Sequence, residues 1–218
     1  QIEMRTVPIT LEHPTLDIEE AIRMCDENTI CIVPIMGVTW TGMNDDVEAL
    51  NDALETYNAK TGHNIPIHID AASGGFILPF LFPEKKWDFR LKWVYSISTS
   101  GHKYGLVYPG LGWVIWRDKV YLPGDMSFSV NYLGASISQV GLNFSRPAAQ
   151  ILGQYYNFIH LGFEGYKDIH TNSMDIAGYC HKAIGKIHCF ENYSEKLDNP
   201  LFIWKMKPEY EEKANWTL

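Results

Sequence analysis

Two short apolar runs separated by an amphipathic helix constrain the fold of this chain more than any other sequence feature. Residues 29–36 and 65–69 are continuous apolar runs of strand length, a pattern typical of strands buried on both faces. Between them, residues 45–62 repeat apolar side chains at helical spacing and end on a glycine that can cap a helix. Because strand, helix and strand in this order are typical of a parallel sheet with crossover helices, we predict an α/β fold with a mostly parallel central sheet.

Further elements are expected on both sides of this unit. Residues 17–27 should form a helix, and residues 93–98 and 112–116 should form two more strands. From residue 147 to about residue 187 the sequence is helical, which predicts either one long helix or a kinked pair.

The end of the chain has a different character. Residues 201–206 are expected to form one more strand, and Asn215 could cap a helix. We therefore predict that residues 1–165 are part of a large domain. Residues 166–218 would then supply a connecting helix and the beginning of a smaller α+β domain.

Composition excludes several classes of protein. Of the 218 residues, 46% are apolar and 20% are charged, with 26 Asp and Glu against 18 Lys and Arg. The net charge of -8 repels phosphate backbones and anionic lipid headgroups, so we expect neither nucleic acid nor a membrane surface as a partner. No apolar run approaches the roughly 18 residues that a membrane-spanning helix needs.

The cysteines and the first residues indicate a cytoplasmic piece of a longer protein. The four cysteines form no C-x-x-C pair, which favours buried free thiols in a reducing compartment. The chain begins at Gln1, with neither an initiator Met nor a basic and apolar secretory leader.

Polar and glycine-rich segments follow three of the predicted strands. They are residues 37–42, 70–75 and 99–105, and they supply hydroxyls, a carboxylate and a His-Lys pair. In open α/β sheets, ligands gather beyond the carboxyl ends of the strands, because the loops there can present polar groups while the sheet stays rigid. We therefore expect a ligand site at this edge of the sheet.

Asp70 and Lys103 point to the chemistry of that site. An aspartate that ends an apolar strand is costly to bury without a cationic partner. Lys103, between glycines and next to His102, is a candidate for a desolvated amine that forms a Schiff base with a carbonyl. Pyridoxal phosphate (PLP) needs both groups, because its ring nitrogen takes a carboxylate and its aldehyde takes an amine. Ser100 and His102 would contact the phosphate.

Other interpretations of the same residues stay open. Asp70 could cap a loop or pair with an arginine, Lys103 could be an ordinary surface lysine, and Thr39 could be a turn hydroxyl. A metal site could use His68, Asp70 and His102, although the sequence offers no further ligand.

Several longer segments closely resemble glutamate decarboxylases of the bacterial, plant and fungal type. The Ser-x-His-Lys motif at residues 100–103 alone indicates only the wider group II family of PLP-dependent decarboxylases. The run from residue 70 to residue 89 and the Asn-Phe-Ser-Arg-Pro segment at residues 143–147 resemble the glutamate branch. The similarity extends over nearly the whole chain.

The resemblance implies a fold type I enzyme and a role for each matching residue. Lys103 would form the internal aldimine with PLP, and Asp70 would pair with the ring nitrogen. The other implied cofactor contacts are Thr39 and Ala72 beside the ring and Ser100 and His102 at the phosphate.

The resemblance also implies an obligate homodimer or a larger oligomer with shared active sites. Phe144 and Ser145 resemble a loop that reaches the phosphate of the neighbouring subunit, and Tyr132 lies in a segment that borders the active-site entrance in this family.

The implied activity is decarboxylation of L-glutamate to 4-aminobutanoate and carbon dioxide, through a lysine aldimine and a ring-stabilised carbanion. The family's chains extend beyond both ends of this one, so the chain alone is expected to be inactive. Two alternatives remain. The parent protein could be a group II decarboxylase or lyase for another amino acid, or it could be a truncated, non-catalytic dimerisation partner.

Overall fold

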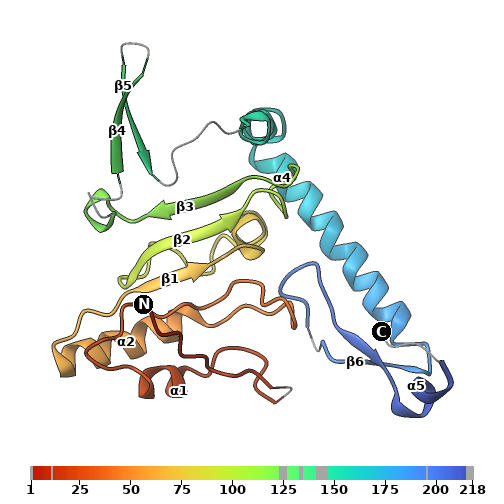
Figure 1. Ribbon diagram of the computed structural model, residues 1–218. Helices are drawn as coiled ribbons and strands as arrows, with labels where there is room; N and C mark the ends of the chain where they lie inside the picture. The colour runs from red at the N-terminus through yellow and green to blue at the C-terminus, as the bar shows by residue number, and fades with distance from the viewer. Residues whose placement is uncertain are drawn as a thin grey trace.

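A computed structural model describes residues 2–10, 12–122, 127–132, 135–140, 147–194 and 196–214 (Figure 1). Three strands form its central sheet, in the order β1 (Ile67–Asp70), β2 (Val94–Ser100) and β3 (Gly112–Trp116). β1 and β2 are parallel, as predicted, whereas β3 pairs with β2 in the antiparallel direction. The short β2–β3 connection holds no crossover helix, so the chain turns back on itself there.

The segment predicted as a buried strand at residues 29–36 is not a regular strand. It runs parallel to β1 but forms only isolated bridges, Ile32 with Ile67 and Ile35 with Asp70. The prediction that both faces are buried is wrong, because Ile35 is 36% exposed. Pro34 has no N–H to donate, and the Ile35 N–H donates to a carboxylate oxygen of Asp45 (2.6 Å) instead of to a strand.

Helices α1 (Ile18–Arg23) and α2 (Val47–Thr61) lie together on one side of β1 (Figure 1). α2 confirms the predicted amphipathic helix. Its N-terminus is capped by Asp46, whose side chain accepts a hydrogen bond from the Ala49 N–H, and Gly62 ends it in the left-handed conformation (φ 77°).

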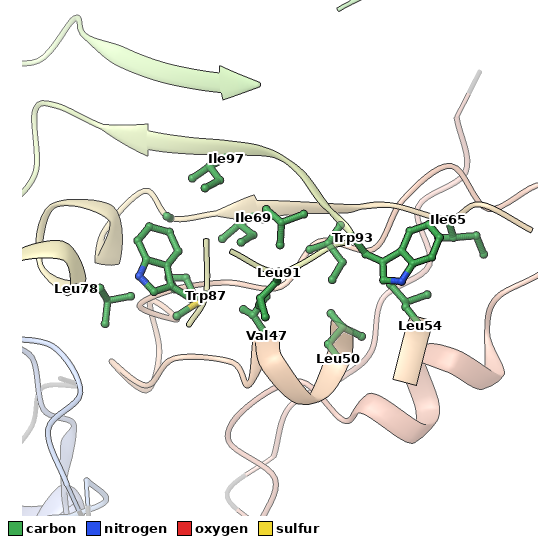
Figure 2. Close-up of a cluster of buried hydrophobic side chains, with 14 residues drawn as sticks. Val47, Leu50, Leu54, Ile65, Ile69, Leu78, Trp87, Leu91, Trp93 and Ile97 are labelled. Atoms are coloured by element: carbon green, nitrogen blue, oxygen red, sulfur yellow. The ribbon is translucent and has the colours of Figure 1, made fainter. Parts of the chain in front are cut away.

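The hydrophobic core lies between α2 and the sheet. Figure 2 shows Val47, Leu50 and Leu54 of α2 pointing toward β1, and all three are at most 2% exposed. They pack in one cluster with Ile69 and Trp93. Burial of each aliphatic side chain stabilises the fold by about 1.5–3 kcal/mol, so this layer holds the strand ends at fixed positions.

The chain after β1 turns through η1 (Gly74–Phe76) and α3 (Leu78–Leu81), and after β3 through η2 (Lys119–Tyr121). β4 (Ser127–Tyr132) and β5 (Ala135–Val140) then form an antiparallel hairpin that the sequence patterns did not predict.

The long helical segment is α4 (Ala149–Ile184), and it is broken at Gly162 (φ 57°, ψ -164°). Of the two predicted possibilities, the kinked pair is therefore the one observed. Figure 1 shows the two parts of α4 running in different directions beside the edge of the sheet.

The C-terminal part is a small unit beside the second part of α4 (Figure 1). β6 (Phe190–Asn192) pairs with β7 (Trp204–Met206), and α5 (Pro208–Ala214) follows. The strand predicted at residues 201–206 is thus shorter than expected. Asn215 lies outside the described residues. The predicted domain boundary after residue 165 falls inside α4, close to its break, and stays a prediction.

Across the described ranges, we find no helix whose length and hydropathy would let it cross a bilayer. All four cysteines are free and half-buried, so they are less buried than predicted, and the reducing compartment stays a prediction.

Candidate functional site

The segments that follow residues 29–36, β1 and β2 meet at one edge of the sheet. A Cβ placed on Gly37, which has φ 87°, would lie 2.8 Å from Ser73 Cβ. A Cβ placed on Gly75 would lie 2.5 Å from Thr99 Oγ1. Glycines at these positions let the three backbones approach closely, so the polar groups of three separate loops face one small region.

Asp70 is the last residue of β1 and is half-buried. Its Oδ1 accepts a hydrogen bond from the Ala72 N–H (3.0 Å), which fixes the turn that leads out of the strand. The loop-capping interpretation is therefore correct for one oxygen. None of the described residues forms an ion pair with Asp70, so the arginine pairing considered for it is not observed there.

Lys103 lies in the loop after β2, and its side chain reaches the loop after β1. The side chain is exposed, so the prediction of a desolvated amine is wrong for this structure. Its Nζ donates to Ser73 Oγ at 3.5 Å, a long and therefore weak hydrogen bond. Between the two loops, the Ser100 N–H donates to the carbonyl of Ala72 (3.3 Å). The structure thus brings Lys103, Ala72 and Ser100 to the same strand ends as Asp70.

His102 is exposed beside Lys103, and its orientation is set by one hydrogen bond. Its Nδ1 lies 3.0 Å from the carbonyl oxygen of Leu111. A carbonyl can only accept, so the proton is on Nδ1, and Nε2 is left for a ligand.

Thr39 lies on the exposed loop after residues 29–36. Two turns shape this loop, because the Val38 N–H donates to Met43 O (2.8 Å) and the Gly42 N–H donates to Val38 O (2.7 Å). A residue far along the chain holds it in place: buried Asn199 donates from Nδ2 to the Gly42 carbonyl (2.9 Å). Sequence patterns gave no signal for Asn199.

The metal alternative finds no support in the described part of the chain, where no three His, Cys, Asp or Glu side chains are arranged to hold an ion. His68 lies on β1 and its Nδ1 is 2.7 Å from Ser96 Oγ on β2. Burial lowers the pKa of His68, and the negative charge of Asp70 opposes this shift.

Three residues named from the resemblance cannot be placed. Phe144 and Ser145 lie outside the described residues. Tyr132 ends β4, but only its backbone is described.

Sequence reasoning missed a set of α4 side chains that hold the loop carrying Lys103. Gln154 and Tyr166 both donate to the carbonyl of Gly105 (2.8 and 3.0 Å). Asn157 donates to Leu106 O (2.9 Å). A signal for them existed: Gln154 and Asn157 are polar residues at helical spacing in an otherwise apolar stretch of α4.

Comparisons with known proteins show which family the chain resembles. The conserved domain of pyridoxal-dependent decarboxylases matches residues 1–207. Glutamate decarboxylase beta of Listeria monocytogenes is 49% identical over 217 residues, which are 100% of this chain and 46% of that protein. Glutamate decarboxylase 5 of Arabidopsis thaliana is 50% identical over 95% of this chain and 42% of its own length. The chain therefore spans about half the length of the curated relatives it matches.

Among solved structures, the glutamate decarboxylase of Lactobacillus brevis superposes with a TM-score of 0.90 at 46% identity. The match covers 97% of this chain and 47% of that one. This similarity confirms the fold type I architecture that the sequence resemblance implied. The match of the conserved domain to nearly the whole chain, together with the shared identity and fold, shows that this chain belongs to the pyridoxal-dependent decarboxylase family.

Proposed function

We propose that the protein containing this chain is a PLP-dependent carboxy-lyase that converts L-glutamate to 4-aminobutanoate and carbon dioxide. The observation that carries the proposal is the placement of the Lys103 amine against the loop that begins at Asp70. Relatives named glutamate decarboxylase, about half identical over the whole chain, support glutamate as the substrate.

The residues present fit the cofactor. A half-buried carboxylate without an ion pair among the described residues suits a protonated ring nitrogen, because such a pair satisfies both charges. Among the described residues, the Lys103 amine makes one long hydrogen bond, which keeps it available for an aldehyde. Gly37 and Gly75 let the loops pack closely, because a Cβ on either glycine would lie within 2.8 Å of the side chain of Ser73 or Thr99.

When bound, PLP supplies an electron-withdrawing ring that accepts the electrons left when the carboxylate leaves. The chain's own residues bind and orient it. We assign covalent attachment to Lys103 Nζ and retention of the ring-nitrogen proton to Asp70, whose Oδ2 is the oxygen not used by the Ala72 N–H.

The remaining assignments concern the ring and the phosphate. Thr39 and Ala72 would contact the ring, while Ser100 and His102 would bind the phosphate. Ala72 is well placed for this role, because its backbone is bonded both to Asp70 and to Ser100. His102 would offer Nε2, because its hydrogen bond to the Leu111 carbonyl uses Nδ1.

We also propose that the protein is a homodimer or a larger oligomer in which Phe144 and Ser145 reach the neighbouring subunit's phosphate. The first part of α4 supports an interface, because large apolar side chains are exposed on it; they include Ile151, Leu152, Tyr155, Tyr156 and Ile159. Residues 1–165 would belong to the cofactor domain and residues 166–218 would begin the smaller one. A cytoplasmic location is in keeping with the four free thiols.

The test is borohydride reduction of the complete, PLP-loaded protein followed by peptide mapping, with glutamate turnover measured in parallel on unreduced protein. We expect a phosphopyridoxyl group on Lys103 and release of carbon dioxide from L-glutamate. Label without glutamate turnover would reject the substrate, and a panel of other amino acids would then identify the true one. Absence of label on Lys103 would reject the catalytic role and favour a non-catalytic partner.

A further inference from the structure

The loop between β2 and β3 is held from outside by side chains of α4. It contains Lys103 and has little regular structure of its own. Along the loop, the carbonyl of Gly105 accepts two hydrogen bonds from α4, and those of Leu106 and Pro109 accept one each, from Asn157 and Gln150. The backbone nearest to the lysine is thus the most strongly held.

Two buried residues share the Gly105 carbonyl. Gln154 is 0% exposed and Tyr166 is 1% exposed. Gln154 Nε2 also donates to the Tyr166 hydroxyl (2.8 Å), so the two side chains and the carbonyl form a closed triangle. Burial raises the pKa of Tyr166, which keeps the hydroxyl protonated and able to donate.

The break in α4 lets both residues reach the same point. Gln154 precedes Gly162 and Tyr166 follows it. In a straight helix, residues twelve positions apart are separated by about 18 Å along the axis, too far to share one acceptor. The non-helical backbone at Gly162 therefore creates the triangle.

Two glycines of the loop leave room for the side chain of Gln154. A Cβ on Gly101 would lie 2.5 Å from Gln154 Oε1, and one on Gly105 would lie 2.8 Å from the same atom. Leu106, the next residue, has φ 65°, a left-handed conformation that is unfavourable for a residue other than glycine. External contacts must hold the loop in this conformation, because the chain would not adopt it alone.

We propose that Gln154 and Tyr166 are positioning residues that fix the backbone beside Lys103, through the Gly105 carbonyl, and thereby present its amine to PLP. The proposal rests on the proposed function, because it concerns the amine that would bond to the cofactor. It predicts that losing the two donors impairs the covalent bond to Lys103 and leaves non-covalent cofactor binding intact.

The test compares two cofactor forms on the complete apo-protein. PLP can bond to Lys103, since the amine adds to the aldehyde carbon and water leaves. Pyridoxamine phosphate has no aldehyde and can only bind non-covalently. The first variant is Gln154→Met, which keeps the length of the side chain. The second is Tyr166→Phe, which keeps the ring that stacks on Phe80 with 4.9 Å between the ring centroids. Ser173→Ala is the matched control, because Ser173 lies on α4 and its described hydrogen bond stays within that helix, to Ile169 O.

We expect Gln154→Met and Tyr166→Phe to slow formation of the borohydride-trappable PLP–Lys103 bond about tenfold each, with the Kd for pyridoxamine phosphate unchanged. Ser173→Ala should change neither quantity. Equal weakening of both cofactor forms would overturn the proposal, because it would show a general structural role. Unchanged bond formation in both variants would overturn it as well.

Hydrogen exchange of the apo-protein separates this proposal from the proposed function. The N–H groups of Leu106 and Val107 bond within the loop, to Lys103 O and Gly101 O. They should exchange faster in both variants, while the amides of β2 stay protected. If wild-type Lys103 took no label, the proposed function would fail, and the exchange result would still decide whether the two residues hold the loop. Unchanged exchange at both amides would count against that role.

Discussion

Replacing Gly37 with alanine should reveal how much the close approach of the strand-end loops contributes. Two costs are expected. An alanine in the left-handed backbone conformation of residue 37 destabilises the folded state by about 1–2 kcal/mol. This cost is offset by about 0.4–1 kcal/mol, because alanine also has fewer conformations than glycine in the unfolded chain. Its Cβ would also lie 2.8 Å from Ser73 Cβ and 3.4 Å from the Gly74 nitrogen, an overpacked contact worth about 1–3 kcal/mol. The free energy of unfolding should therefore fall by about 1–5 kcal/mol.

Gly62→Ala is the matched control. Gly62 has a similar positive φ of 77°, but nothing lies within 4 Å of a Cβ placed on it. Gly62→Ala should therefore lower the free energy of unfolding by the conformational cost alone, about 1 kcal/mol. The assay is urea unfolding of the complete protein, with PLP retention measured alongside. Because Ser73 accepts the hydrogen bond from Lys103, only Gly37→Ala should weaken PLP retention. Equal destabilisation by the two substitutions would refute the claim that the loops touch.

Three further predictions concern the core, a buried histidine and the lysine. Leu54→Ala should lower the free energy of unfolding by about 2–5 kcal/mol in urea; a loss below 1 kcal/mol would contradict tight packing against the sheet. Burial lowers the pKa of His170 in the folded protein, and a weaker hydrogen bond with the Tyr104 backbone opposes this shift. Because the unfolded chain then binds the proton more readily than the folded protein, the free energy of unfolding should fall as the pH drops through 6.5. His170→Phe should remove part of this acid sensitivity in unfolding curves between pH 7 and pH 5, and identical curves would exclude the effect. Lys103→Ala should abolish the borohydride label while changing the unfolding free energy by less than about 0.5 kcal/mol, because the side chain is exposed; retained label would assign the bond to another amine.

The elements that the sequence predicted well are those whose cause is local. α2 has its apolar repeat, its acidic N-cap and its final glycine within one continuous segment. The site loops were located for a similar reason, because each follows directly after an apolar run. The parallel pairing of β1 and β2 agrees with the mostly parallel sheet that was predicted from the strand–helix–strand order of residues 29–69.

The features that were missed depend on distant partners. Apolar content alone made residues 29–36 look like a regular strand, whereas Pro34 and the carboxylate of Asp45 interrupt the ladder there. The direction of β3 depends on the path of the β2–β3 connection, and the composition of the strand does not indicate that path. The hydrogen bond from Asn199 to the Gly42 carbonyl holds the loop that contains Thr39. It joins residues 157 positions apart, and no pattern in a single segment indicates such a contact.

The same distinction explains why the motif around Lys103 shows only part of the site. Ser100, His102 and Lys103 form a short continuous motif, because a strand end and a tight loop present all three together. The groups that restrain this loop come from the two parts of a broken helix, 49 and 61 residues beyond Gly105. A chain with an intact motif and without Gln154 or Tyr166 would keep Lys103 but lose hydrogen bonds that hold the backbone of its loop. Under the proposed function, the motif would identify the lysine, whereas the reactivity of that lysine would depend on the fold of α4.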